Sequence, residues 1–170
     1  MNKFSKYKYC PVCGEFLIDL QTIDNRKYFK CGECDVELYK SQKLGVIVLV
    51  ELYDEIVLVK RNQEPFKGSW TTPAGFVEYD ESPEQTAIRE TKEETGLDIT
   101  HPLLFGIYFD TDDPRGNTVS IAYTAKAISF ETKINDEVSE IQAFEENYLP
   151  KNIQFESIKR VLEDYCGYKQ

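Results

Sequence analysis

Apolar runs separated by polar turns predict several short strands along the chain. Residues 44–50 form an unbroken apolar run, and a polar turn at residues 53–55 separates it from a second β-branched run at residues 56–59. Two such runs joined by a short polar turn predict a hairpin whose first strand is buried. Further strands are expected at residues 103–109, 118–127 and 141–144.

Two segments have helical patterning, residues 83–95 and residues 152–166. The first carries its own boundary signals: Ser82 is a good N-cap, Gln85 completes a capping box, and a proline occupies the first helical position. Gly96 follows directly and is expected to end the helix. Strands interleaved with two helices predict an α+β or an α/β/α arrangement.

The first helix combines a thin apolar stripe with a group of acidic residues. The stripe is formed by Ala87, Ile88, Thr91 and Thr95. Beside it lie Glu90, Glu93 and Glu94, whose spacing places the carboxylates on one face. Like charges repel at this spacing, and the C-terminal end of a helix disfavours anions. Isolated glutamates would form a solvated face, but three convergent ones here predict a site for Mg²⁺ or Mn²⁺.

Four of the five cysteines form two Cys-x2-Cys pairs near the start of the chain, Cys10, Cys13, Cys31 and Cys34. This spacing is typical of a four-cysteine zinc site, in which each pair wraps one side of a tetrahedral ion. No coordination position stays open for a reacting water, so the Zn²⁺ is expected to be structural. A disulfide or redox site is the alternative, which a reducing compartment disfavours.

The segment around the cysteines is too short to build a core of its own, so metal binding would supply its folding energy. Short strands are expected at residues 16–18 and 28–30. The segment resembles the zinc ribbons that precede catalytic domains in several enzyme families. We therefore expect a zinc ribbon at residues 1–40 and a second domain at residues 41–170, with the join within residues 37–43.

Composition narrows the function classes. The 170 residues are 41% hydrophobic and 13% aromatic, enough to build a core, and carry a formal net charge of −10 at pH 7. This acidic balance argues against binding nucleic acid through a basic face, but not against a small phosphate ligand held with a metal ion. No apolar run could span a membrane, and the basic start of the chain lacks a signal peptide's apolar core, so a cytoplasmic location is expected.

The glutamate helix is part of a longer motif. Gly75, five residues, Glu81, seven residues and then a run starting at Arg89 resemble the Nudix box, whose charged and glycine positions are all matched over 23 residues. Thr91 stands where the family prefers an aliphatic residue, which is expected to weaken packing slightly and leave the chemistry unchanged. The resemblance covers roughly residues 44–170 and implies the Nudix α/β/α sandwich with a mixed sheet.

Nudix enzymes hydrolyse a nucleoside diphosphate linked to another moiety, by attack of water on one phosphorus. The resemblance implies Glu90 and Glu94 as direct ligands of Mg²⁺ or Mn²⁺, and Glu93 as a ligand or a holder of water. Divalent ions are needed because a diphosphate and a carboxylate cluster, both anionic, would otherwise repel each other.

Four neighbouring residues complete the implied site. The carbonyl of Ala74 or of Gly75, on the loop before the helix, is a further expected metal ligand, and Gly75 is also expected to contact substrate. Arg89 is expected to pair with a box glutamate and hold the array in position. Glu81, just ahead of the helix, is expected to meet the metal ions through water.

Other segments supply further candidates for the general base and for substrate contacts. In this family the base is a box glutamate or one from a distant loop, for which Glu137 and Glu140 are the candidates and Glu137 is preferred; a solvated charged loop is the alternative. Arg115 lies in a segment, residues 113–120, that resembles one in ADP-ribose pyrophosphatases, and its planar fork suits a phosphate or terminal ribose. The simpler interpretation of residues 113–116 is a type I turn, which is compatible with a binding role for Arg115.

Other candidate contacts are less specific. The aromatic residues that are candidates for stacking on a nucleoside base are Phe66, Trp70, Phe105 and Tyr108. The cations expected on solvated edges rather than on phosphates are Lys60, Arg61 and Lys67.

Two function classes follow. The first is a hydrolase, with ADP-ribose cleaved to AMP and ribose 5-phosphate as the expected reaction and NADH, another dinucleotide or a nucleotide sugar as the alternative. NADH is disfavoured because the Ser-Gln-Pro-Trp-Pro signature of NADH pyrophosphatases is missing after the box. The second class is a non-catalytic regulator that senses a nucleotide or binds RNA, against which the complete carboxylate set argues. Dimers are common among related enzymes, so a homodimer is a candidate assembly.

Overall fold

The computed structural model describes residues 8–23, 26–39, 41–111 and 113–169. The chain divides into two compact units, Met1–Gln42 and Lys43–Gln170. This boundary lies two residues beyond the one expected after residue 40. Within the described ranges, no helix is long and apolar enough to cross a membrane.

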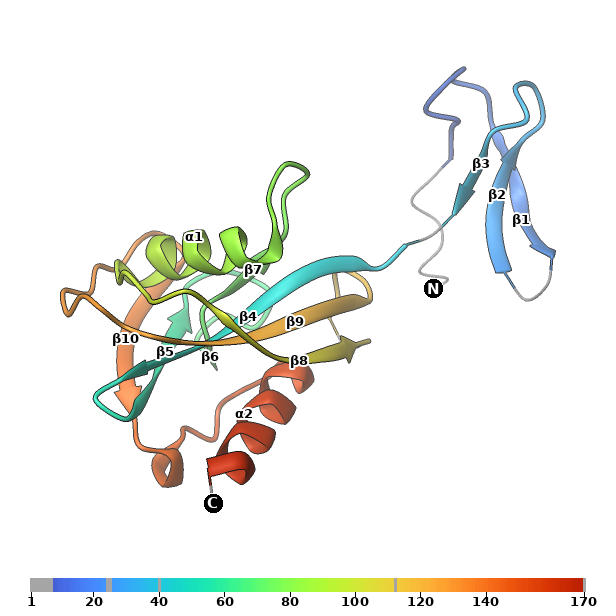
Figure 1. Cartoon of the computed structure of the whole chain (residues 1–170). Helices are drawn as coiled ribbons and strands as arrows, with labels where there is room; N and C mark the ends of the chain where they lie inside the picture. Colours follow the sequence, from blue (N-terminus) through green and yellow to red (C-terminus); the bar gives the residue numbers. More distant parts are fainter. Residues whose placement is uncertain (1–7, 24–25, 40, 112, 170) are drawn as a thin grey trace. The chain divides into compact units, whose positions relative to one another are not determined.

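The first unit contains a three-stranded antiparallel sheet in the order β1 (Leu17–Ile23), β2 (Arg26–Cys31) and β3 (Glu37–Tyr39) (Figure 1). The expectation that residue 37 begins the join is wrong, because β3 pairs with β2. Tyr39 lies opposite Tyr28, and their rings are 5.3 Å apart. β3 therefore belongs to the sheet of the first unit and contributes a ring that packs beside Tyr28.

The second unit is built on a mixed sheet with the strand order β10-β5-β4-β9-β8. Its strands are β4 (Lys43–Leu52), β5 (Glu55–Arg61), β8 (Leu103–Asp110), β9 (Thr118–Lys126) and β10 (Val138–Phe144). β4 and β9 run parallel, and the other neighbours are antiparallel. Two short strands join this sheet, β6 (Trp70–Thr71) beside β5 and β7 (Ala74–Phe76) beside β4.

β4 and β5 form the predicted hairpin. Its loop residues Tyr53 and Asp54 have φ angles of 53° and 65°, the combination found in a two-residue type I′ turn. The β4–β5 pairs lie next to this loop, whereas at the other end β4 pairs with β7 and β5 with β6. The two strands therefore diverge toward the end of the sheet that carries the candidate site.

Helices cover both faces of this sheet, α1 (Pro83–Thr95) on one and α2 (Glu156–Lys169) on the other (Figure 1). Ile47 and Leu49 of β4 pack in one core cluster with α2, while the alternate valines of the strand pack in a second cluster with Ala87 of α1. Successive strand residues point to opposite faces, so a strand covered on both sides must be apolar at every position. The predicted α/β/α sandwich with a mixed sheet is confirmed.

α1 has the predicted bounds, with a complete capping box and Gly96 in the left-handed region at φ 78°. Its predicted apolar stripe is wrong at one position, since Ile88 is 43% exposed and Thr86 is fully buried. The helix turns about 100° per residue, so a helix that presents Ala87 to the sheet directs the next residue away from it. The hydroxyl of the buried Thr91 donates to the Ala87 carbonyl at 2.8 Å, so the polar residue in the aliphatic position of the box is satisfied.

The C-terminal helix begins later than predicted. A short 3₁₀ turn, η1 (Glu146–Tyr148), follows β10. Ile153 then forms a bridge with Trp70 of β6, which keeps this stretch extended until α2 begins at Glu156. The predicted helix start at residue 152 is therefore wrong by one turn.

Candidate active site

A pocket of about 210 Å³ lies where β4 and β5 diverge. Glu90 and Glu94 of α1 line it, together with Glu137 from the loop before β10. The lining of a neighbouring hollow of about 540 Å³ includes the same three residues together with Glu93 and Asn135. These carboxylates, which are far apart in sequence, therefore lie at the boundary between the two hollows.

β7 holds the two helix glutamates against the pocket. Glu94 is 6% exposed, and its Oε2 accepts a hydrogen bond from the Ala74 N–H at 3.1 Å. Gly75 lies directly against the Glu90 carboxylate, where a side chain would collide with it. The strand that precedes the helix thus approaches both carboxylates through its backbone.

Burial controls the protonation of this pair. It raises the pKa of Glu94 to about 8, and it also raises the pKa of Glu90. Glu94 is buried and Glu90 is partly buried, and carboxylates in such surroundings lose their protons readily only when positive charge compensates them. Their oxygen-only donor set is the type that binds Mg²⁺ or Mn²⁺, so the residues present fit a divalent cation.

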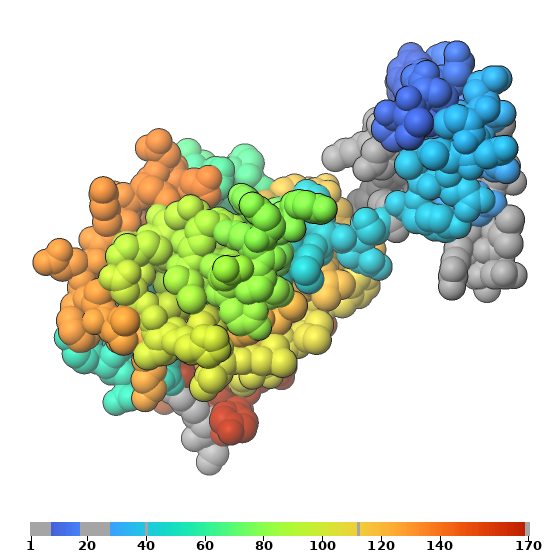
Figure 2. Space-filling view, turned by 45° about the horizontal axis from the view of Figure 1, so that its top comes forward, coloured from blue at the N-terminus to red at the C-terminus, as the bar shows by residue number. Residues whose placement is uncertain are grey.

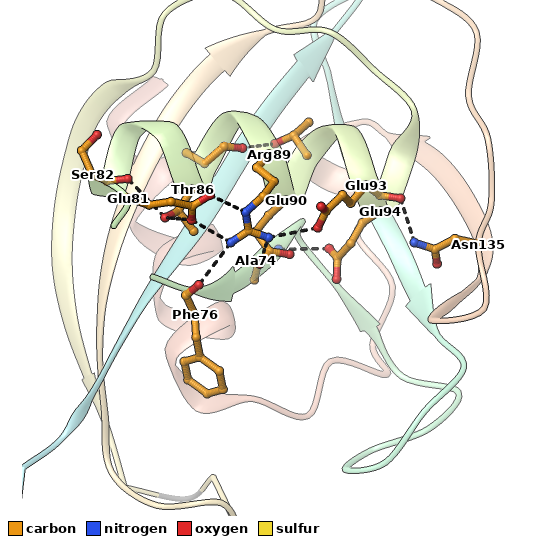
Figure 3. A network of polar contacts seen from close by, with 12 residues as sticks. Ala74, Phe76, Glu81, Ser82, Thr86, Arg89, Glu90, Glu93, Glu94 and Asn135 are labelled. Carbon is orange, nitrogen blue, oxygen red and sulfur yellow. Dashed lines mark hydrogen bonds and ion pairs between the residues drawn. The ribbon is translucent and has the colours of Figure 1, made fainter. Parts of the chain in front are cut away.

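Arg89 organises the remaining acidic residues of the motif (Figure 3). Its Nε and Nη2 donate to Glu81 at 2.6 and 2.9 Å, and its Nη1 donates to Glu90 at 2.8 Å and to Glu93 at 3.0 Å. The hydrogen bonds from Arg89 hold the pKa of Glu81 at about 2. Glu81 lines neither hollow, and Glu93, with a side chain that is 56% exposed, lines only the larger one.

The two acidic residues considered for the general base have different surroundings. Glu137 lines both hollows beside Glu90 and Glu94. Glu140 lies in β10, forms an ion pair with Lys60 at 3.0 Å and lines neither hollow. Only Glu137 of these two therefore lies with the carboxylates of α1.

Two arginines line the same pocket. Arg115 lies in the expected turn, closed by the Gly116 N–H donating to the Asp113 carbonyl at 3.0 Å, and its Nη2 contacts the buried Asp113 carboxylate at 2.8 Å. Arg61 was missed by the sequence analysis, which places it on a solvated edge. It is half-buried, its Nε donates to the Pro65 carbonyl at 2.9 Å, and burial together with the charge of Arg115 lowers its pKa.

The aromatic lining differs from the expectation. None of the candidates Phe66, Trp70, Phe105 and Tyr108 lines the pocket, and Trp70 is in the core. Phe76 and Phe155 line it instead. The Arg115 guanidinium lies 4.9 Å from the Phe76 ring centre, and that of Arg61 lies 5.4 Å from the Phe155 ring centre.

The four cysteines form a separate cluster in the first unit. Their sulfur atoms all lie within 4.8 Å of one another, with 3.6 Å between Cys10 and Cys34 and 3.4 Å between Cys13 and Cys31. Sulfurs bound tetrahedrally to zinc at about 2.3 Å lie about 3.8 Å apart, whereas a disulfide bond is about 2.05 Å long. Hydrogen bonds from backbone N–H groups lower the pKa of Cys10 to about 7 and also lower that of Cys31, whereas neighbouring sulfurs together with burial raise the pKa of Cys13 and of Cys34. This group could hold a metal ion.

Comparison with curated proteins gives two informative relatives. The ADP-ribose pyrophosphatase of Methanocaldococcus jannaschii is 38% identical over 133 residues, which are 78% of each chain. The NAD-capped RNA hydrolase NudC of Pseudomonas aeruginosa is 30% identical over 158 residues, which are 92% of this chain and 54% of NudC. This chain thus spans about half the length of that second relative.

Solved structures resemble both the sheet and its helices. A NUDIX hydrolase from Nitrosomonas europaea matches with a TM-score of 0.81 and 28% identity over 95% of this chain and 92% of its own. The NUDIX domain of Shewanella oneidensis NrtR, solved with ADP ribose, matches with a TM-score of 0.66 and 26% identity over 78% and 91%. The family model for the NUDIX domain matches residues 41–165. The chain therefore belongs to the NUDIX family and is a Nudix hydrolase.

Proposed function

We propose that this protein hydrolyses ADP-ribose to AMP and ribose 5-phosphate with Mg²⁺ or Mn²⁺ as catalytic cofactor. One observation carries the proposal: the pocket that contains Glu90, Glu94 and Glu137 is also lined by Arg61 and Arg115. Carboxylates suit a divalent cation, and guanidinium groups suit phosphate oxygens, so this combination fits a diphosphate ester. The activity of the M. jannaschii relative supports ADP-ribose as the substrate.

Glu90 and Glu94 would hold the cation, with the carbonyl of Ala74 or Gly75 as a further ligand. Glu93 would be a further ligand at the edge of the larger hollow, where a hydrogen bond from Arg89 holds its carboxylate. When bound, the cation neutralises the diphosphate and makes a water molecule more acidic. Glu81 would act through its contact with Arg89, which fixes the positions of the other glutamates, or through water.

Glu137 is proposed as the general base. It takes a proton from the attacking water, whose oxygen forms a bond to one phosphorus while the bond from that phosphorus to the bridging oxygen breaks. The departing group leaves as a phosphate ester. A base of this kind contributes about 10²- to 10⁴-fold to a rate, and it must lie within hydrogen-bond reach of the attacking water.

The arginines and aromatic rings would bind the rest of the substrate. Arg61 and Arg115 present planar donors to phosphate or ribose oxygens. Phe76 and Phe155, which stack against these arginines, hold the guanidinium planes in place and offer apolar surface to a base or sugar. Asp113 keeps Arg115 oriented toward the pocket.

A dinucleotide is the second candidate substrate. The match to NudC covers 158 residues, more than the length of the second unit, so it extends into the cysteine-rich unit. Because that relative acts on NAD-capped RNA, NADH and NAD-capped RNA belong in any substrate comparison. For the cysteine cluster itself we propose structural Zn²⁺, bound by all four thiolates.

The test is hydrolysis with Mg²⁺ against ADP-ribose, NADH, NAD-capped RNA, a diadenosine polyphosphate and a nucleotide sugar, with products separated by chromatography. The proposal expects AMP and ribose 5-phosphate from ADP-ribose at the highest kcat/KM. A higher kcat/KM for NADH or NAD-capped RNA would select the dinucleotide alternative. No turnover of any compound, with divalent cation bound, would revive a role as a nucleotide sensor.

A further inference from the structure

The loop between β9 and β10 is fastened to the C-terminal end of α1. The Lys133 N–H donates to the Thr95 carbonyl at 2.8 Å. The Asn135 Nδ2 donates to the Glu93 carbonyl at 2.7 Å (Figure 3). In the space-filling view this loop, in orange, lies beside the yellow-green end of the helix (Figure 2). The last carbonyls of a helix have no partner within it, so the loop satisfies groups that would otherwise need water.

Asn135 also holds the backbone of Glu137. Its Oδ1 accepts hydrogen bonds from the Glu137 N–H at 2.8 Å and from the Val138 N–H at 3.0 Å. Its amide nitrogen meets a carbonyl and its amide oxygen meets two N–H groups, so the side chain uses both ends in the only orientation that satisfies them. One side chain therefore links the carboxylate-bearing end of α1 to the backbone of the proposed base.

Asn62 holds the same residues from the other side. Its N–H donates to the Glu137 carbonyl at 2.7 Å, and its Nδ2 donates to the Asp136 carbonyl at 3.0 Å. Asn62 directly follows the last residue of β5, so this contact ties the loop to the central sheet. The peptide groups on both sides of the Glu137 Cα are therefore fixed.

Apolar packing does not provide this placement. Residues 131–137 are all exposed, and Val138 is the first buried residue of the following strand. An exposed loop without buried side chains takes its position from its hydrogen bonds, and its opening costs little when they are lost. Beyond the pairing of the buried Val138 with Arg61 of β5, the two asparagines are thus the groups that hold the Glu137 backbone in place.

We propose that Asn135 and Asn62 are positioning residues that hold Glu137 against Glu90 and Glu94, with Asn135 also coupling the loop to α1. The inference rests on the proposed role of Glu137 as base. The positioning role is distinct from that of the base, because it requires neither asparagine to contact the substrate or a cation.

Two variants of Asn135 separate positioning from simple stabilisation. Asn135→Ala removes all three contacts and should lower kcat for ADP-ribose about 10- to 100-fold, the effect of a small misplacement of a reacting group, with KM changed less than about threefold. Asn135→Asp keeps the oxygen that accepts from the Glu137 and Val138 N–H groups, so it should recover part of the loss. Asn152→Ala is the control, because it removes a similar side-chain bond to the Gly68 carbonyl outside the pocket, and should leave kcat unchanged.

The decisive test combines Asn135→Ala with Glu137→Gln. If Asn135 acts through Glu137, then Asn135→Ala should lower kcat by less than about twofold in the Glu137→Gln background, because effects on one catalytic unit do not multiply. Independent losses that multiply in the double variant would overturn the inference. A Glu137→Gln variant with full activity would instead refute the proposed base.

Amide hydrogen exchange tests the same contacts without turnover. The Glu137 and Val138 amides should exchange faster in Asn135→Ala than in the wild-type protein, and near the wild-type rate in Asn135→Asp. Unchanged exchange in Asn135→Ala would overturn the inference even if ADP-ribose proved not to be the substrate.

Discussion

Gly75 and Glu90 lie so close together that a Cβ atom on Gly75 would be 1.9 Å from Glu90 Oε1. The backbone at Gly75 cannot easily yield, because it is paired with Val46 of β4. Nor does Gly75 belong to the glycines with positive φ in the described part of the chain. The motif glycine is therefore needed here for close approach to the carboxylate rather than for an unusual backbone conformation.

Gly75→Ala should give a folded but nearly inactive protein. The carboxylate is the flexible end of a side chain, so it can swing aside, but it then leaves the position beside Glu94. A shift of about 1 Å in a reacting group costs about 100-fold, so kcat/KM for ADP-ribose should fall at least that far. Gly167→Ala in α2, where a Cβ meets nothing within 4 Å, is the control and should retain full activity. Near-normal turnover by Gly75→Ala would mean that Glu90 need not occupy this place.

Glu94→Gln should lower the activity and raise the stability of the metal-free protein. The glutamine oxygen can still accept from the Ala74 N–H, but the buried charge is gone. Loss of a proposed cation ligand should lower kcat by about 100-fold or more. In the absence of divalent cations and near pH 8, the variant should nonetheless unfold at a higher temperature than the wild type. Thermal unfolding with and without Mg²⁺, alongside steady-state rates, measures both effects.

The pH dependence of this effect has a definite sign. The pKa of Glu94 is about 8 in the folded protein, against an ordinary value of 4.5, so the folded state keeps a proton that the unfolded chain releases. In the metal-free wild type, the contribution of Glu94 to the free energy of unfolding should therefore be fully present below about pH 4.5. It should be lost progressively as the pH rises toward 8. Divalent cations should bind more tightly over the same rise, because they replace the proton. An affinity that does not change between pH 6 and pH 8 would contradict the assignment.

Glu137→Gln and Glu140→Gln form a matched pair. The two residues lie three positions apart, but only Glu137 lines the pocket, while Glu140 pairs with Lys60. Removing a general base should lower kcat by about 10²- to 10⁴-fold with little change in KM, whereas Glu140→Gln should stay within about twofold of wild type. Steady-state kinetics on ADP-ribose distinguishes the two variants. If Glu137→Gln had the kcat of the wild type, the general base would have to be one of the box glutamates.

Local signals in the sequence were sufficient for the elements that carry the motif. The bounds of α1 follow from Ser82, Gln85 and Gly96, because a capping box and a left-handed C-cap are determined by neighbouring residues. The burial of β4 follows from its unbroken apolar run. The start of α2 was missed because Ile153 pairs with Trp70, a contact between residues far apart in the chain.

The walls of the pocket were harder to predict for the same reason. Lys60 and Arg61 are adjacent in sequence and alternate in direction along β5, but no local signal tells which of them faces a pocket. Phe155 lines it only because the stretch before α2 returns to β6. Asn135 and Asn62 were missed because their role depends on contacts with the backbone of another segment. Motif positions are therefore predictable, and the residues that surround the substrate come from tertiary structure.

Arg61→Ala tests the missed arginine. A hydrogen bond to a charged group contributes about 1.5–3 kcal/mol, so KM for ADP-ribose should rise about 10- to 100-fold. Arg61→Lys should restore only part of this, because lysine keeps the charge but lacks the planar fork. Lys60→Ala should leave KM unchanged, since Lys60 is outside the pocket and pairs with Glu140. Equal effects of Arg61→Ala and Lys60→Ala would show that only the general charge matters.

Cys13→Ser tests the proposed zinc site. Three thiolates and a serine hydroxyl bind Zn²⁺ far more weakly than four thiolates, because the hydroxyl stays protonated at neutral pH. Metal analysis after dialysis should therefore find one zinc per chain in the wild type and little in the variant. Cys166→Ser, which changes the cysteine in α2, is the control and should retain the zinc.

The same variant shows what the metal does for the first unit. With the zinc lost, backbone amides of β2 should exchange faster, because a segment this small lacks enough buried apolar surface to stay folded alone. The second unit has its own core clusters, so amides of β4 should keep their protection. Full zinc content in Cys13→Ser would rule out a four-thiolate site. Loss of zinc with unchanged β2 exchange would show that the three-stranded sheet is stable without the ion.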